Sequence, residues 1–265
     1  MNFELSKEQV AIQRAAWEFA QGEFGKDVAL DHELNHRVPR EIWRRACDLG
    51  LIGINYPEEL GGQGYGLLER VLVTEQFCRR DVGLGIAVLV LDFGTGLILK
   101  YGSQAQKEKY VVPVAAGKAI SGGAFTEPAH GSDITRMETM AVKDSDEWVI
   151  NGSKMFISNG CIASFLVVLC QTDPAANRAY RGMSTIIVET DRPGFEATEM
   201  GEKMGLKMTS TAQIALDSVR VPLTNLVGVE GRGAYHALEL FDEMRVKVAA
   251  RAIIRGFMLK ASPIR

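Results

Sequence analysis

The sequence has few of the features that would place it outside the ordinary globular proteins. It contains only four cysteines in 265 residues, and no two of them form a C-x-x-C pair. A disulfide-rich secreted domain and a cysteine-based metal motif are therefore not indicated, and a reducing compartment fits best. The four histidines show no H-E-x-x-H or related zinc spacing, so we predict no metal site.

Neither the charge nor the first residues indicate a nucleic-acid-binding or secreted protein. The chain has 30 basic and 33 acidic side chains and a net charge of −3, so no basic excess is present to neutralise a phosphate backbone. Met1 to Glu4 lack the basic and apolar regions of a signal peptide. We expect a protein that binds no nucleic acid and works in the bacterial cytoplasm or, as an alternative, in the mitochondrial matrix.

One stretch raises the question of a membrane span. The segment from Val82 to Leu99 is mostly apolar, but it includes Asp92 and several glycines. An aspartate at the centre of a bilayer costs roughly 2.5–3.5 kcal/mol on insertion scales, and no basic flank compensates here. We predict a buried helical segment of a core, broken by glycine, and no membrane span.

The first 118 residues are predicted to form an all-helical domain. Ser6 to Gln9 and Ser103 to Gln106 match the capping box, which opens a helix. Apolar residues recur at helical spacing after Pro39, and another helix is predicted from about Leu67 to Arg80. Pro113 is predicted to interrupt the last helix of this domain.

From Ile120 the apolar period becomes that of strands. β-rich runs separated by turn residues predict a mostly antiparallel β-domain over residues 119–226, with Asn151-Gly152 as the strongest hairpin signal. Residues 227–265 are predicted to be helical from about Arg232 to Lys260, which is long for a globular helix. We therefore expect an α+β chain, C-terminally incomplete, that holds only the first helix of a C-terminal bundle.

The motifs of several enzyme classes are absent from the sequence. There is no complete G-x-G-x-x-G, no G-x-x-x-x-G-K-[ST] and no G-x-S-x-G, so dinucleotide, P-loop and hydrolase sites are not indicated. The informative segments are instead Ala124 to Asp133 (AFTEPAHGSD) and Asn151 to Gly160 (NGSKMFISNG). Together they resemble the paired signatures of the acyl-CoA dehydrogenase family. Further segments that fit the family, in its order, are Tyr56 to Gly62, Lys100 to Ser103, Leu216 to Pro222, and Phe241-Asp242 with Arg245.

The resemblance implies a flavoprotein that uses FAD to oxidise the α–β bond of an acyl-CoA thioester. It implies an N-terminal helical domain, a middle β-domain and a C-terminal helical bundle, assembled as a homotetramer that passes electrons to an electron-transfer flavoprotein. The FAD-binding positions that it implies in this sequence are Phe125, Thr126, Phe156, Ile157 and Ser158. An aromatic ring supplies stacking area, and small hydroxyls supply donors without blocking the substrate face. Each of these residues, taken alone, is also typical of a turn or a strand core.

The resemblance also implies a binding site for the CoA portion at Ser132, Asp242 and Arg245. A guanidinium suits phosphate oxygens, and a carboxylate suits amide N–H groups. The alternative for Asp242 and Arg245, which lie three residues apart on one helix, is a simple intrahelical ion pair.

The catalytic base is not evident from the resemblance. Most of the family places a glutamate in a part of the bundle beyond this sequence, and a minority places it at the position of Met244, which cannot accept a proton. Glu243 would point away from that face by about 100°. Asp92 remains as the candidate, because it stands alone in an apolar segment that, by resemblance, lines the acyl pocket. Burial there would raise its pKa toward the range of a general base, and some relatives that act on alicyclic thioesters use such an aspartate. The alternative is a helix cap or a hydrogen bond to nearby backbone.

Other functions remain open on the same fold. Acyl-CoA oxidases, enoyl-CoA reductases and flavin monooxygenases share the scaffold, and a non-catalytic truncated homologue is a further alternative. The expected substrate is a short or alicyclic acyl-CoA.

Overall fold

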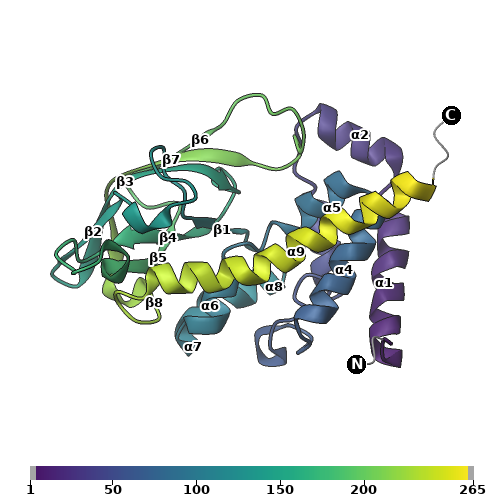
Figure 1. Cartoon of the computed structure of the whole chain (residues 1–265), viewed down its shortest axis with the longest axis horizontal. Helices are drawn as coiled ribbons and strands as arrows, with labels where there is room; N and C mark the ends of the chain where they lie inside the picture. Colours follow the sequence, from purple (N-terminus) through teal and green to yellow (C-terminus); the bar gives the residue numbers. More distant parts are fainter. Residues whose placement is uncertain (1–3, 262–265) are drawn as a thin grey trace.

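A helical region and a β-sheet region lie at opposite ends of the structure, and one long helix runs along both (Figure 1). The computed structural model describes residues 4–261, and the side chains of residues 4–252. The long helix, α9 (Gly233–Ala261), packs on α4, α5 and α6 at the helical end and on β4 and β5 at the sheet end. This architecture confirms the predicted fold class.

The helical region consists of eight α-helices and the loops between them. The predicted capping box at Ser6 is confirmed, since its hydroxyl accepts from the backbone N–H of Gln9 and the Gln9 side chain accepts from the backbone N–H of Ser6. Trp43, Phe24 and Phe77 are fully buried in the core of this region. The helices are α1 (Lys7–Glu23), α2 (Lys26–Leu34), α3 (Arg40–Asp48), α4 (Leu67–Arg80), α5 (Val82–Leu89), α6 (Thr95–Tyr101), α7 (Gln104–Gln106) and α8 (Val112–Ala115).

The apolar stretch from Val82 to Leu99 is divided between α5 and α6, and Asp92 lies in the break between them. Among the described helices, none combines the length and the apolar character that crossing a bilayer requires. The break places the Asp92 side chain beside the helices that precede it in the chain, as described below.

The helix that Pro113 is predicted to interrupt changes its hydrogen-bond pattern just before the proline and continues past it. A π-helical turn, η2 (Lys107–Val111), lies between α7 and α8 and carries the helix up to the proline. Proline has no N–H to donate to the preceding turn. The wider π turn changes the hydrogen-bond pattern just before that position, so the chain stays helical to Ala115.

The sheet region is a single mixed sheet in the order β6-β7-β3-β2-β4-β5-β8, with β1 paired to β4. The pairs are antiparallel except β1 with β4 and β2 with β4. The strands are β1 (Ser121–Ala124), β2 (Met140–Asp144), β3 (Glu147–Ser158), β4 (Phe165–Gln171), β5 (Met183–Glu189), β6 (Phe195–Glu199), β7 (Thr211–Pro222) and β8 (Leu226–Val227). Short 3-10 turns are η1 (Glu58–Leu60), η3 (Ile134–Arg136), η4 (Ala179–Gly182) and η5 (Leu223–Asn225).

The hairpin predicted at Asn151-Gly152 is wrong. The tight turn lies between β2 and β3, where Ser145 has a φ of 57°. Asn151 and Gly152 lie within β3, at a register shift against β7 between Ile150 and Gly152. An added Cβ on Gly152 would lie 2.5 Å from the Thr139 hydroxyl oxygen. Gly152 therefore lies at a β-bulge, where the close approach of Thr139 leaves no room for a side chain, and not at a chain reversal.

Helix α9 begins within one residue of its predicted start, but its buried face differs from the predicted one. Of the predicted stripe Ala237, Phe241, Met244 and Val248, the last is 52% exposed. The predicted end of the helical segment at Ser262-Pro263 lies outside the described residues.

Glu189, at the end of β5, ties the sheet to the helical region. Its carboxylate accepts from the hydroxyl of Tyr110 and from Nζ of Lys109 at 2.9 Å, both in η2. Burial alone would raise its pKa, but these hydrogen bonds outweigh burial and lower the pKa to about 2. Since the folded-state pKa lies below the unfolded one, the stabilisation is present above the unfolded pKa and is lost as the pH falls through the folded value.

We therefore expect Glu189→Gln to lower the free energy of unfolding by about 2 kcal/mol at neutral pH, and the difference from the wild type to narrow at pH 3. Urea unfolding at the two pH values measures this. Glu196→Gln, an exposed carboxyl on β6, is the matched control. Equal stability of Glu189→Gln and wild type at pH 7 would contradict the assignment.

Candidate active site

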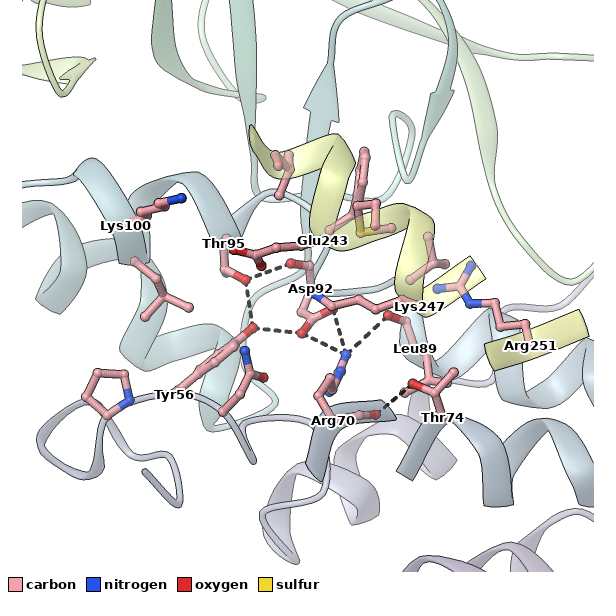
Figure 2. A pocket seen from close by; sticks show the side chains of 18 residues that line it. Tyr56, Arg70, Thr74, Leu89, Asp92, Thr95, Lys100, Glu243, Lys247 and Arg251 are labelled. Carbon is pink, nitrogen blue, oxygen red and sulfur yellow. Dashed lines mark hydrogen bonds and ion pairs between the residues drawn. The ribbon is translucent and has the colours of Figure 1, made fainter. Parts of the chain in front are cut away.

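A cavity of about 290 Å³ lies between α9 and the helical region (Figure 2). Its walls come from the loop around Tyr56, from α4, from the α5–α6 segment and from one face of α9. It is lined by Asn55, Tyr56, Pro57, Arg70, Thr74, Leu89, Val90, Asp92, Phe93, Thr95, Gly96, Leu99, Lys100, Leu240, Glu243, Met244, Lys247 and Arg251.

The sequence had indicated that Asp92 stands alone among apolar residues. In the structure it has two hydrogen-bonding partners. Nη2 of Arg70 lies 3.0 and 3.2 Å from its two carboxylate oxygens, and the hydroxyl of Tyr56 donates to it at 2.8 Å. The side chains of Arg70 and Asp92 are 4% and 12% exposed. Asp92 is thus a nearly buried carboxylate in a fixed orientation, with its charge balanced by a guanidinium.

The partners of Asp92 are themselves held by further hydrogen bonds. Arg70 also donates to the carbonyl oxygen of Ile52, and the Tyr56 hydroxyl lies 2.7 Å from Thr95 Oγ1. Burial, followed by the charge of Asp92, raises the pKa of Tyr56 well above its usual value, so Tyr56 stays a hydrogen-bond donor. Gly62 fixes the backbone of Tyr56, because an added Cβ there would lie 2.2 Å from the Tyr56 carbonyl oxygen.

Arg70 and Tyr56 were both missed by the sequence analysis. Arg70 occupies a position on the buried face of α4, one and two turns before the buried residues Val73, Thr74 and Phe77. A charged residue on an apolar helical stripe is a signal for a buried ion pair, and it could have pointed to Asp92.

Helix α9 presents three charged side chains to the cavity. Glu243, Lys247 and Arg251 line it, and Figure 2 shows Lys247 reaching from α9 toward Asp92 and Glu243 pointing toward Thr95. The expectation that Glu243 points off this face is therefore wrong. The cavity borders a wide part of the surface of α9, so two consecutive residues, Glu243 and Met244, both line it.

The two signature segments lie side by side. The backbone N–H of Met155 donates to the carbonyl oxygen of Thr126 at 2.9 Å, and an added Cβ on Gly122 would lie 2.7 Å from the carbonyl oxygen of Ser158. Ile157 is buried in the sheet. Phe125 is also buried, and its ring contacts Phe93 and Phe241, with centroids 6.4 and 5.3 Å away.

The strip formed by these segments fits the flavin that the resemblance implies. Phe156 is 62% exposed and has a φ of 60°, at a register shift between Lys154 and Ile157. A positive φ at a bulky residue is backbone strain, and such strain is concentrated at ligand-binding and active sites. Nearby, the hydroxyls of Thr126 and Ser158 form no hydrogen bond with any described residue. The exposed ring of Phe156 could stack on a flavin ring, and the hydroxyls of Thr126 and Ser158 could donate hydrogen bonds to it.

The residues expected to bind CoA lie at the surface. Asp242 and Arg245 form an ion pair with each other on α9, and both are exposed by more than two thirds. This is the intrahelical pair weighed above, and it leaves both charges accessible to a ligand. Ser132 is exposed in the loop after the first signature segment, and no described contact joins it to Asp242 or Arg245.

Two parts of the chain match known family models. The family model "Acyl-CoA dehydrogenase, N-terminal domain" matches residues 6–118, and the model "Acyl-CoA dehydrogenase, middle domain" matches residues 122–219. The chain is 37% identical to an acryloyl-CoA reductase (NADH) of Anaerotignum propionicum, over 96% of this chain and 64% of that protein.

Solved structures give the same picture. A structure from a study of the electron transferring flavoprotein of Acidaminococcus fermentans matches with a TM-score of 0.90 and 34% identity, over 96% of this chain and 66% of that one. A glutaryl-CoA dehydrogenase from Mycobacterium smegmatis in complex with FADH2 matches with a TM-score of 0.85 and 28% identity, over 94% of this chain and 62% of that one. The chain spans 58 to 66% of the length of the first three curated relatives.

Proposed function

Because this chain belongs to the acyl-CoA dehydrogenase family, which is FAD-dependent, we propose that it oxidises the α–β bond of a short or alicyclic acyl-CoA thioester. The observation that carries the proposal is Asp92, a carboxylate fixed by Arg70 and Tyr56 in a cavity whose wall includes Phe93. Phe93 contacts Phe125, so the cavity adjoins the strip that fits a flavin. We place the domain boundaries between residues 118 and 119 and between residues 226 and 227.

Phe125, Thr126, Phe156, Ile157 and Ser158 are the residues that would hold FAD. Phe156 offers its ring as a stacking face, and Thr126 and Ser158 offer hydroxyl donors. Phe125 and Ile157 are buried and fix the backbone on either side. The chemistry that FAD supplies when bound is the acceptance of a hydride from the β-carbon.

The protein itself must remove the α-proton, and Asp92 is the proposed acceptor. Its carboxylate is oriented by two donors, and its side chain is only 12% exposed. Ser132, Asp242 and Arg245 would contact the CoA portion at the surface, where a guanidinium suits phosphate oxygens. The ion pair between Asp242 and Arg245 would then open or be shared with the ligand.

The proposed partners follow from the same family membership. They are an acyl-CoA substrate, an electron-transfer flavoprotein as electron acceptor, and further copies of the chain in a homotetramer. The proposed compartment is the bacterial cytoplasm, and it is supported by the four free cysteines, none of which is paired.

An anaerobic titration tests the proposed activity. The protein is purified with added FAD and titrated with butyryl-CoA and cyclohexanecarboxyl-CoA, and the absorbance of oxidised flavin is followed. We expect bleaching with at least one thioester and reoxidation by an electron-transfer flavoprotein. Rapid reoxidation by oxygen instead would indicate an oxidase or a monooxygenase. Colourless protein after loading with FAD would indicate a non-catalytic homologue.

A second candidate, reduction of an enoyl thioester, is supported by the likeness to the acryloyl-CoA reductase (NADH). The same site could add a hydride and a proton across the double bond, because the two directions use the same groups. Consumption of NADH upon addition of acryloyl-CoA, with no bleaching by butyryl-CoA, would favour this direction.

A further inference from the structure

The cavity beside Asp92 contains more positive charge than its carboxylates balance. Four cations line it, namely Arg70, Lys100, Lys247 and Arg251, against the two anions Asp92 and Glu243. Arg70 is paired with Asp92, and Lys100 is paired with Glu239, which lies outside the cavity. This leaves Lys247 and Arg251 without an ion-pair partner among the described residues, and the carboxylates whose charge acts on Lys247 are Asp92, already paired with Arg70, and Glu243.

Neither of these two cations makes a hydrogen bond or a close ion pair with a described residue. Nζ of Lys247 makes no hydrogen bond or ion pair there, and Nε of Arg251 is buried without a hydrogen bond. Burial first, and then the charge of Arg70, lowers the pKa of Lys247, while Asp92 and Glu243 oppose this. Burial also lowers the pKa of Arg251. A buried charge without a counter-charge is costly, and an anion placed between the two would relieve that cost.

The two cations follow one another along the face of α9 that borders the cavity. Successive residues of a helix rise by about 1.5 Å, so Lys247 and Arg251 lie about 6 Å apart along α9. Leu240 and Met244 line the same face closer to the sheet, where the flavin strip lies. A chain that enters from the sheet side passes Asp92 and Lys247 before it reaches Arg251 (Figure 2).

We propose that Lys247 and Arg251 form an anion site at the far end of the cavity, and that the substrate is the CoA thioester of a dicarboxylic acid. The free carboxylate at the end of the acyl chain binds between the two cations. This inference rests on the proposed function, and it adds the class of acyl group.

Binding of matched thioesters tests the inference. The full chain is loaded with FAD and reduced anaerobically with dithionite, so that bound thioester is not oxidised, and dissociation constants are measured by calorimetry. The probes are glutaryl-CoA against pentanoyl-CoA and adipyl-CoA against hexanoyl-CoA, which have equal chain lengths within each pair. We expect the dicarboxylic member of at least one pair to bind at least tenfold more tightly.

Variants locate the effect. Lys247→Met is expected to weaken binding of the dicarboxylic thioester at least tenfold. Its affinity for the monocarboxylic thioester is expected to stay the same or to rise. Lys247→Arg is expected to keep the preference for the dicarboxylic thioester. Lys100→Met removes a cavity cation that is already paired, and it is expected to keep the preference as well. Preference that survives in both Lys247→Met and Arg251→Met would overturn the anion site.

The experiment distinguishes failure of the anion site from failure of the proposed function. If both members of each pair bind more tightly than free CoA but with equal affinity, the thioester site stands and the anion site is refuted. If no thioester binds more tightly than free CoA, the proposed function fails together with the inference.

Discussion

Replacing Asp92 with asparagine is expected to slow exchange of the α-hydrogen of a bound acyl thioester by about 10³-fold, because the amide cannot accept the proton. The exchange is measured by mass spectrometry after anaerobic incubation in deuterium oxide. Asparagine retains one oxygen that can accept from Arg70 or Tyr56, but it leaves the buried Arg70 guanidinium without its counter-charge, so a loss of stability is also expected. The far-ultraviolet circular dichroism and the Tm of the variant check that it is folded.

Two further variants interpret that result. Asp48→Asn replaces an exposed aspartate on α3, and it should leave exchange unchanged. Glu243→Gln removes the other carboxylate of the cavity, and we expect a much smaller loss because Glu243 has no hydrogen-bond donor among the described residues to orient it. Retained exchange in folded Asp92→Asn, with loss in Glu243→Gln, would transfer the role to Glu243.

Replacing Glu127 with alanine is expected to lower the free energy of unfolding by about 3–5 kcal/mol, because it breaks a buried ion pair. Nζ of Lys154 lies 2.8 Å from Glu127 Oε1, and the two side chains are 0% and 4% exposed. The same carboxylate accepts from the backbone N–H groups of Glu138 and Thr139, at 2.7 and 3.0 Å. Alanine would leave an ammonium group without its counter-charge and two amides without an acceptor.

Urea unfolding at neutral pH measures this loss. Glu127→Gln keeps an acceptor for the amides and should lose less than the alanine variant. The neighbouring Glu138→Ala is the control, since the Glu138 side chain is 76% exposed and its one ion pair with a described residue is to His130 at 3.4 Å. A loss in Glu127→Ala no larger than in Glu138→Ala would show that the pair contributes nothing to stability.

Local signals in the sequence predicted much of the fold. The capping box at Ser6 and the bounds of α4 depend on neighbouring residues, and both are found as predicted. Helix α2 was missed because it buries no residue, so it has no apolar stripe to detect. The Asn151-Gly152 signal was misread because a glycine with a positive φ suits a bulge as well as a turn.

The candidate site was less accessible to prediction, for a physical reason. Asp92 receives its hydrogen bonds from residues that are 22 and 36 positions away in the chain, and only the packing of α4 and the Tyr56 loop brings them together. The two signature segments could be identified because each is continuous. The faces of α9 depend on where the helix crosses the cavity, which periodicity alone does not determine.

The tight packing at Gly62 links the loop that contains it to the position of Asp92 in the cavity. The phenol that steadies Asp92 is carried by a backbone whose carbonyl leaves no room for even one methyl group on Gly62. Substitution of Gly62 would therefore disturb the Tyr56–Asp92 hydrogen bond, although Gly62 itself does not line the cavity. Gly62 is therefore a position at which the hydrogen bonding of Asp92 can be altered without replacing any residue that lines the cavity.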